Sequence, residues 1–201
     1  MPYRGRIGAP LSGFAMNAGL PVGNRRLVHT RHISCTAYER ADGLLDIEGH
    51  LVDSKPFPLE LSERGALAPG AAIHEMLLCL TVDRGLTIRD VRARTMHAPY
   101  GICGAIGDSY RQLIGLQIGR GFVRHVKSLF RGVAGCSHLT ELLSPIATTA
   151  YQALWGDPLA KGRDGRFAAS LKTPSPVDGC HALRSDGEIV RSNPQRFQQQ
   201  D

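Results

Sequence analysis

The sequence lacks any uninterrupted apolar stretch near the roughly 20 residues that a membrane-spanning helix requires. Its first 26 residues carry arginines, but glycine and proline interrupt them repeatedly, so they hold no continuous apolar segment of the kind a signal peptide contains. A Walker phosphate loop, a dinucleotide-binding glycine fingerprint and the His-x-Glu with Pro-Cys-x-x-Cys signature of zinc deaminases are all missing. These absences predict a cytoplasmic protein that uses no nucleotide cofactor.

Cysteine is scarce as well, with 5 in 201 residues. An odd number of widely spaced cysteines does not make a disulfide scaffold, and in a reducing compartment each is a core residue, a metal ligand or a reactive thiol. Cys35 and Cys79 lie among apolar residues, so we expect them in the core. Cys103 and Cys136 stand at junctions between elements, where they are free for chemistry or buried as small side chains.

The formal net charge of +6 comes mainly from arginine. Arginine admits an anionic partner because its guanidinium binds phosphate and carboxylate through two hydrogen bonds. The basic residues are scattered and no known nucleic-acid-binding motif accompanies them, so nucleic acid is not the expected partner.

Two pairs of alternating segments predict a sheet. Residues 29–40 and 44–53 alternate between apolar and polar positions around an Asp-Gly turn, which is a strong hairpin signal. Residues 76–82 and 86–95 form a second such pair around Asp-Arg-Gly. The segment 54–71, with three prolines, is expected to be a long loop.

The period then changes to that of helices, which we expect over 109–116, 120–131 and 138–155. In 120–131 the apolar residues share one face, and the other face carries Arg120, Arg124, Lys127 and Arg131. This basic stripe is either an ordinary solvated face or a docking surface for an acidic protein partner.

Together these patterns predict an α+β fold: a four-stranded antiparallel sheet of two hairpins, followed by three helices packed on one face. A single domain would span 27–158. Gly- and Pro-rich sequence predicts a flexible N-terminal arm over 1–26 and an extended C-terminal tail over 159–201.

Residues suited to chemistry collect at the ends of the predicted elements. His74 precedes the third strand, Cys103 lies where a strand gives way to a helix, and Cys136 and His138 stand at the start of the last helix. Zinc and iron favour cysteine thiolate and histidine imidazole brought together from different parts of a fold. Glu141, one turn after His138, would orient that imidazole or is ordinary first-turn charge. Further ligands could come from Cys180 and His181.

Two other functions fit the same residues. Cys136 at the start of a helix is suited to act as a nucleophile beside His138, because the helix dipole favours a thiolate there. Alternatively, the cysteines are core residues and the chain is a non-catalytic adaptor that works through its Arg-rich helix.

Four runs in this chain resemble the bacterial family called domain of unknown function 2889: YERADGLLDIEGHLVD, IHEMLLCLTVD, PYGIC and GCSHLTELLSPIATTAYQAL. The resemblance covers roughly residues 27–190 and implies no activity, since the family is uncharacterised.

The chain is also distantly similar to the U-type iron–sulfur cluster scaffold proteins. That similarity implies a ligand set in which His74 takes the place of the scaffold's aspartate, Cys103 that of its second cysteine, and Cys136 and His138 that of its last helix head. Ala71 and Ala72 stand where the first scaffold cysteine would be. With one thiolate fewer, the set His74, Cys103, Cys136 and His138 favours a single zinc or iron ion over a cluster.

Overall fold

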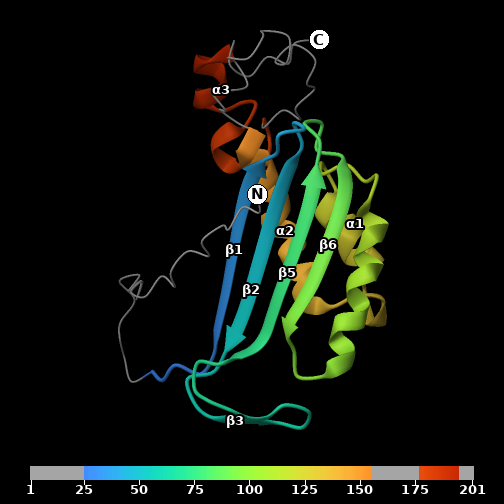
Figure 1. The fold of residues 1–201 in the computed structure, drawn as a ribbon. Coiled ribbons are helices and arrows are strands. Elements are labelled where there is room, and N and C mark those ends of the chain that lie inside the picture. The colour runs from blue at the N-terminus through green and yellow to red at the C-terminus, as the bar shows by residue number, and fades with distance from the viewer. Residues whose placement is uncertain (1–24, 155–176, 195–201) are drawn as a thin grey trace.

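The computed structural model describes residues 25–154 and 177–194. Its centre is a four-stranded antiparallel sheet in the order β1-β2-β5-β6 (Figure 1). The strands are β1 (Thr30–Glu39), β2 (Leu45–Ser54), β5 (Ala72–Val82) and β6 (Ile88–His97). Both predicted hairpins are therefore confirmed. The first turns at Gly43, whose φ of +83° is one that glycine adopts without strain.

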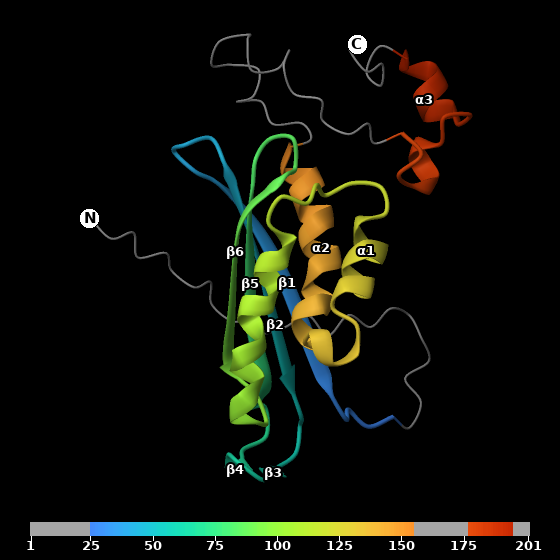
Figure 2. The ribbon, with the colours of Figure 1, turned by 90° about the vertical axis from the view of Figure 1, so that its right-hand side faces the viewer.

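Three helical segments lie on one face of this sheet, as predicted (Figure 2). They are η1 (Gly101–Leu113), a 3₁₀ helix, α1 (Phe122–Leu129) and α2 (Ser137–Leu154), with the short turn η2 (Gly132–Ala134) before α2. The buried residues of α2 recur at helical spacing: Leu139, Leu142, Leu143, Ile146, Ala147 and Ala150. The fold class is α+β, and its core lies between the sheet and these helices.

Alternation along β2 decides which residues face the core. Leu45, Ile47, Leu51 and Asp53 are buried, and Gly49 between them lets α2 approach closely. A Cβ atom at Gly49 would lie 2.7 Å from Cδ1 of Ile146. The backbone of β2 and the side chains of α2 are therefore in direct contact at this point.

Three details differ from the sequence-based expectation. The expected loop 54–71 contains a small hairpin, β3 (Leu59–Leu61) with β4 (Gly65–Leu67), whose three-residue strands are too short to show a period. The first helix begins at Gly101 rather than 109, because a 3₁₀ helix has 3.0 residues per turn and three glycines obscure its apolar side. Cys35 packs against the core, but Cys79 lies on the other face of the sheet, beside Arg92.

The predicted terminal arms lie largely outside the described residues. Within the expected C-terminal tail, however, 177–194 contains two short helical segments, η3 (His181–Leu183) and α3 (Glu188–Ser192). This part is thus not simply extended: Asp178 Oδ1 accepts a hydrogen bond from the backbone of Ser185 and closes the segment on itself.

Candidate functional site

A row of polar side chains crosses three neighbouring strands at one end of the sheet. In the strand register Arg31 of β1 lies directly opposite Asp53 of β2, and Asp53 lies directly opposite His74 of β5. All three share the face that the helices cover. Residues directly opposite one another in a sheet have Cβ atoms only about 5 Å apart, so the pairing itself brings these side chains together.

Asp53 is the centre of this row. Its side chain is 2% exposed and accepts two hydrogen bonds from Arg31, Nε to Oδ1 and Nη2 to Oδ2, each 2.8 Å long. The Nε2 atom of His29, just before β1, lies 3.2 Å from Oδ1. Arg31 and His29 are each 38% exposed, so they form the solvent side of a site whose carboxylate is buried.

The start of α2 closes the site from above the sheet. His138 lies in the first turn of α2, and its Nε2 atom is 3.2 Å from Oδ2 of Asp53. Tyr110 of η1 fixes this start: its buried hydroxyl accepts a hydrogen bond from the N–H of Cys136 and lies 2.8 Å from the carbonyl oxygen of Cys136. The phenol therefore holds the backbone just before α2 in place.

The two imidazoles lie against each other. The ring centroids of His74 and His138 are 3.8 Å apart with an interplanar angle of 26°, and Nδ1 of His74 is 3.4 Å from Oδ2 of Asp53. One ligand atom from each of Asp53, His74 and His138 lies within 4.8 Å of the others. Within the described residues, no other group of three or more histidine, cysteine, aspartate or glutamate side chains brings its ligand atoms this close together. We call it the Asp53–His74–His138 cluster.

Burial and charge set the protonation of the cluster. Burial would raise the pKa of Asp53, but the hydrogen bonds and charge of Arg31, with His29 and His138, lower it to about 2. Burial lowers the pKa of His138 below its ordinary value, and it lowers that of His74 with help from the neighbouring His138. The site therefore holds an ionised carboxylate and two imidazoles that favour the neutral, metal-ligating form.

Two of the four predicted metal ligands, His74 and His138, belong to the cluster. Cys136 lies beside it, with Sγ 3.8 Å from Nδ1 of His138, the ring nitrogen that faces away from Asp53. Cys103 is in the first turn of η1 and is not part of the group. A coordinating role for either cysteine stays a prediction.

The predicted accessory residues lie farther out. Glu141 is exposed and acts on His138 and Arg31 through its charge. Cys180 and His181 are exposed at the start of η3 and lie outside the cluster.

Sequence reasoning missed Asp53, Arg31 and His29, although the signal for the first two was present. Asp53 has the same parity along its strand as Leu45, Ile47 and Leu51, and a carboxylate in a core-facing position requires a partner. The Asp-Gly turn also sets the register that places Arg31 opposite Asp53.

The basic stripe is exposed as a whole. Arg124 and Lys127 lie on α1, and Arg120 and Arg131 lie just beyond its ends. Within the described part of the chain none of the four forms an ion pair. An acidic partner for this surface stays a prediction.

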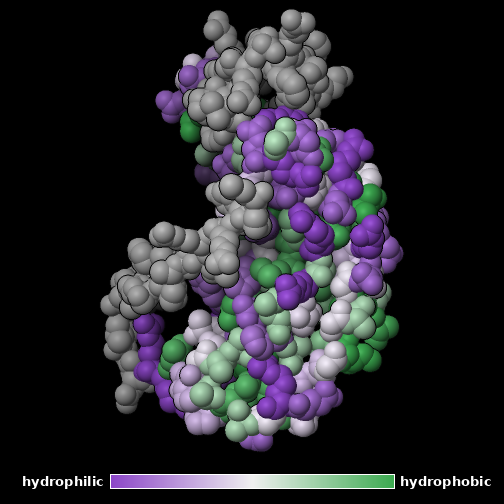
Figure 3. Space-filling view, viewed as in Figure 1, coloured by the Kyte–Doolittle hydropathy of each residue, from purple (hydrophilic) through white to green (hydrophobic). Residues whose placement is uncertain are grey.

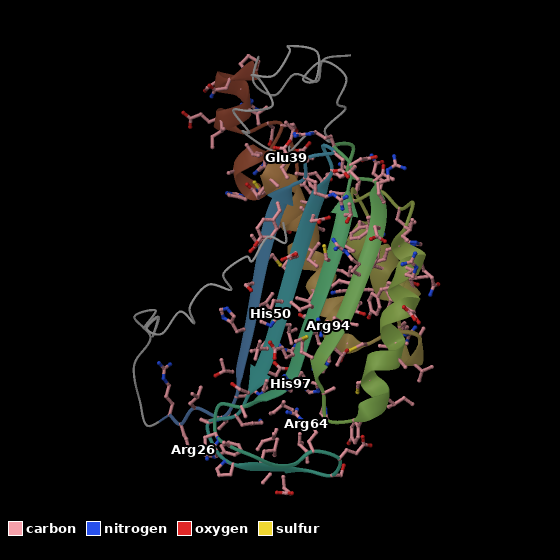
Figure 4. All side chains as sticks on the ribbon, in the orientation of Figure 1. Arg26, Glu39, His50, Arg64, Arg94 and His97 are labelled. Atoms are coloured by element: carbon pink, nitrogen blue, oxygen red, sulfur yellow. The ribbon has the colours of Figure 1, made fainter. Side chains whose placement is uncertain are left out.

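The face of the sheet opposite the helices carries a separate polar group. Glu75 accepts hydrogen bonds from His50 and His97, at 3.0 and 2.8 Å, on neighbouring strands. Hydrophobic and hydrophilic patches lie side by side on this face (Figure 3), and His50, Arg94 and His97 lie along it in Figure 4. Since His74 and Glu75 are adjacent, β5 supplies one residue to each face.

Fold and site together define an α+β domain that keeps a carboxylate–histidine cluster between its sheet and its helices. The chain belongs to the family described as protein of unknown function (DUF2889), which matches residues 29–152, more than half of its length. The matched region includes every member of the cluster. Neither the curated proteins nor the solved structures contain a match, so the similarity to iron–sulfur scaffolds gains no support. No helix in the described residues is long and apolar enough to cross a membrane.

Proposed function

We propose that this chain is a metal-binding protein in which Asp53, His74 and His138 hold one zinc or iron ion. The observation that carries the proposal is the meeting of their three ligand atoms within 4.8 Å. Two histidines and one carboxylate are the ligand set of many catalytic zinc sites and of mononuclear non-haem iron sites.

The distances already suit an ion of this size. With metal–ligand bonds of about 2.0–2.1 Å, neighbouring ligands of a tetrahedral site lie about 3.3–3.4 Å apart. Oδ2 of Asp53 is 3.2 Å from Nε2 of His138 and 3.4 Å from Nδ1 of His74. A bound ion would take the place of the direct contacts between Oδ2 and the two imidazoles, while Arg31 kept its hydrogen bonds to the carboxylate.

The surroundings support the same function. Arg31 and His29 orient the carboxylate, as outer partners of metal ligands do. Three protein ligands leave further coordination positions open, which is typical of catalytic rather than structural zinc. The cluster contains no thiolate, and iron–sulfur clusters are held by cysteine thiolates, so the proposal is a single ion.

Metal analysis with matched variants tests the proposal. The purified protein should bind one equivalent of Zn²⁺ or Fe²⁺, and His74→Ala and His138→Ala should each weaken binding at least about 10-fold. His32→Ala is the control, because His32 is an exposed histidine of β1 on the opposite face of the sheet. Equal affinity in all three variants would refute the site.

A thiol enzyme remains a second candidate because one contact favours it. Cys136, His138 and Asp53 form a chain of contacts, Sγ to Nδ1 at 3.8 Å and Nε2 to Oδ2 at 3.2 Å, in the order of a nucleophile, a base and an orienting carboxylate. Both functions need Nε2 of His138 and Oδ2 of Asp53. Cys136→Ala separates them: it leaves metal affinity unchanged if the ion is held by the cluster. If Cys136 is the nucleophile, it removes the fastest-reacting of the five free thiols, and only the slower reaction of the others, such as exposed Cys180, with alkyl reagents remains.

A further inference from the structure

If the cluster holds a metal ion as proposed, the charges around it do not balance, and the inference below rests on that metal site. A divalent ion, the Asp53 carboxylate and the Arg31 guanidinium leave two positive charges in excess, because His74 and His138 bind metal as neutral imidazoles. In a partly buried site such an excess is costly unless an anion reduces it.

Arg31 has donors left to bind that anion. A guanidinium carries five N–H groups, and Arg31 uses one on Nε and one on Nη2 for Asp53. Its other N–H groups have no other partner among the described residues. The side chain is 38% exposed, so a small molecule can reach it from solvent.

The start of α2 adds further positive charge to the site. His138 lies in the first turn of α2, where the unpaired N–H groups of an 18-residue helix give a positive end, and this turn contains no acidic residue. Glu141, the nearest acidic side chain on α2, is exposed. Its negative charge acts on both Arg31 and His138, so it offsets one of the two excess positive charges at most, and a positive charge remains at the site.

We propose that the substrate or co-ligand of this centre is a small oxyanion, a carboxylate or a phosphate, that bridges the bound ion and the free edge of Arg31. The anion occupies a coordination position that the three protein ligands leave open. Arg31 thereby has two functions: one edge orients Asp53 and the other selects a negatively charged ligand. A planar guanidinium fits both because carboxylate and phosphate oxygens match its paired N–H groups.

Cobalt(II) provides a direct test, because its visible spectrum reports changes in coordination. The full-length protein is loaded with Co²⁺ and titrated with acetate in one arm and inorganic phosphate in the other. We expect at least one anion to change the spectrum and to tighten Co²⁺ binding about 10-fold, with a reciprocal gain in anion affinity. The arm that responds more strongly identifies the class of oxyanion.

Two variants of Arg31 and one control complete the experiment. Arg31→Gln should bind Co²⁺ more weakly, because Arg31 orients Asp53, and at saturating Co²⁺ it should lose most of the anion effect. Arg31→Lys should keep part of that effect, since lysine retains the charge without the paired donors. Arg94→Gln removes the same charge from the opposite face of the sheet and should behave as the wild type. Any response that this control shares with Arg31→Gln comes from anion bound to free Co²⁺.

The outcomes separate the two proposals. Failure of the wild type to bind Co²⁺ refutes the metal centre itself. Normal Co²⁺ binding without a spectral or affinity response to either anion refutes the oxyanion inference alone. An Arg31→Gln protein that is folded by circular dichroism and responds like the wild type refutes the role of Arg31.

Discussion

Replacement of Asp53 by asparagine tests the centre of the site most sharply. Asparagine has nearly the same shape but carries no charge and has one carbonyl oxygen, so one of the two hydrogen bonds from Arg31 is lost. A hydrogen bond to a charged group contributes about 1.5–3 kcal/mol. Breaking a buried ion pair costs about 3–5 kcal/mol, but Arg31 can turn partly to water, so we expect Asp53→Asn to destabilise the fold by about 2–3 kcal/mol.

A bound metal ion should enlarge the stability difference between the wild type and Asp53→Asn. A ligand that binds only the folded state at 100 times its Kd stabilises it by about 2.7 kcal/mol, and Asp53→Asn should lose this gain as well. Urea unfolding followed by circular dichroism, with and without Zn²⁺ at neutral pH, measures both effects. With metal, wild type and variant should differ by about 5 kcal/mol.

A second aspartate provides the control. Asp42 also accepts a two-pronged contact from an arginine, Arg40, but this pair lies on the surface. Asp42→Asn should therefore unfold at nearly the same urea concentration as the wild type. If Asp53→Asn matches Asp42→Asn, the buried ion pair of Asp53 contributes no more to stability than an exposed one. If Zn²⁺ stabilises Asp53→Asn as much as the wild type, Asp53 is not a ligand.

Three further predictions concern pH and packing. The folded-state pKa values of His74 and His138 lie below those of the unfolded chain, so the unfolded state binds more protons. The metal-free protein should therefore lose stability as pH falls below about 6.5. A urea midpoint that stays constant between pH 7 and 5 would contradict this. Gly49→Ala should cost about 1–3 kcal/mol in urea unfolding, since the new methyl group would overlap an isoleucine of α2, and an unchanged midpoint would show that α2 shifts freely. Tyr110→Phe leaves the backbone of Cys136 without its hydroxyl partner and should destabilise by about 1–3 kcal/mol and weaken Zn²⁺ binding, whereas equal Zn²⁺ affinity would exclude a positioning role.

The sheet was predictable because its turns and its alternation agree. Asp42 and Gly43 mark the first turn, and the alternating residues on either side assign a core face to both strands. In β5 the assignment of faces fails: the run MLLCLTV is apolar at both parities, so the sequence does not show that Leu78 is buried while Cys79 lies on the other face. Leu77 and Cys79 on the face opposite the helices are themselves half-buried, so apolar residues are tolerated on both faces of β5 and its apolar–polar alternation is lost.

The site was predictable only in part, for a similar reason. His74 and His138 stood out because histidines at the ends of elements are typical of metal ligands. Asp53 resembled an ordinary charge at a strand end, and only its register with Arg31 and His74 shows that it is buried. Cys103 was predicted as a ligand because cysteine is a common metal ligand, but the residue type alone does not show where the side chain lies in the fold.

The members of the site come from distant parts of the chain, and this has a consequence for how the molecule assembles. Arg31 and Asp53 are 22 residues apart in one hairpin, so their ion pair can form early, as soon as that hairpin closes. His138 reaches the same carboxylate only when α2 has docked across the sheet. Since Nε2 of His138 completes the set of three, a chain in which α2 has not yet docked has no complete site, and metal occupancy would report that α2 has docked on the sheet.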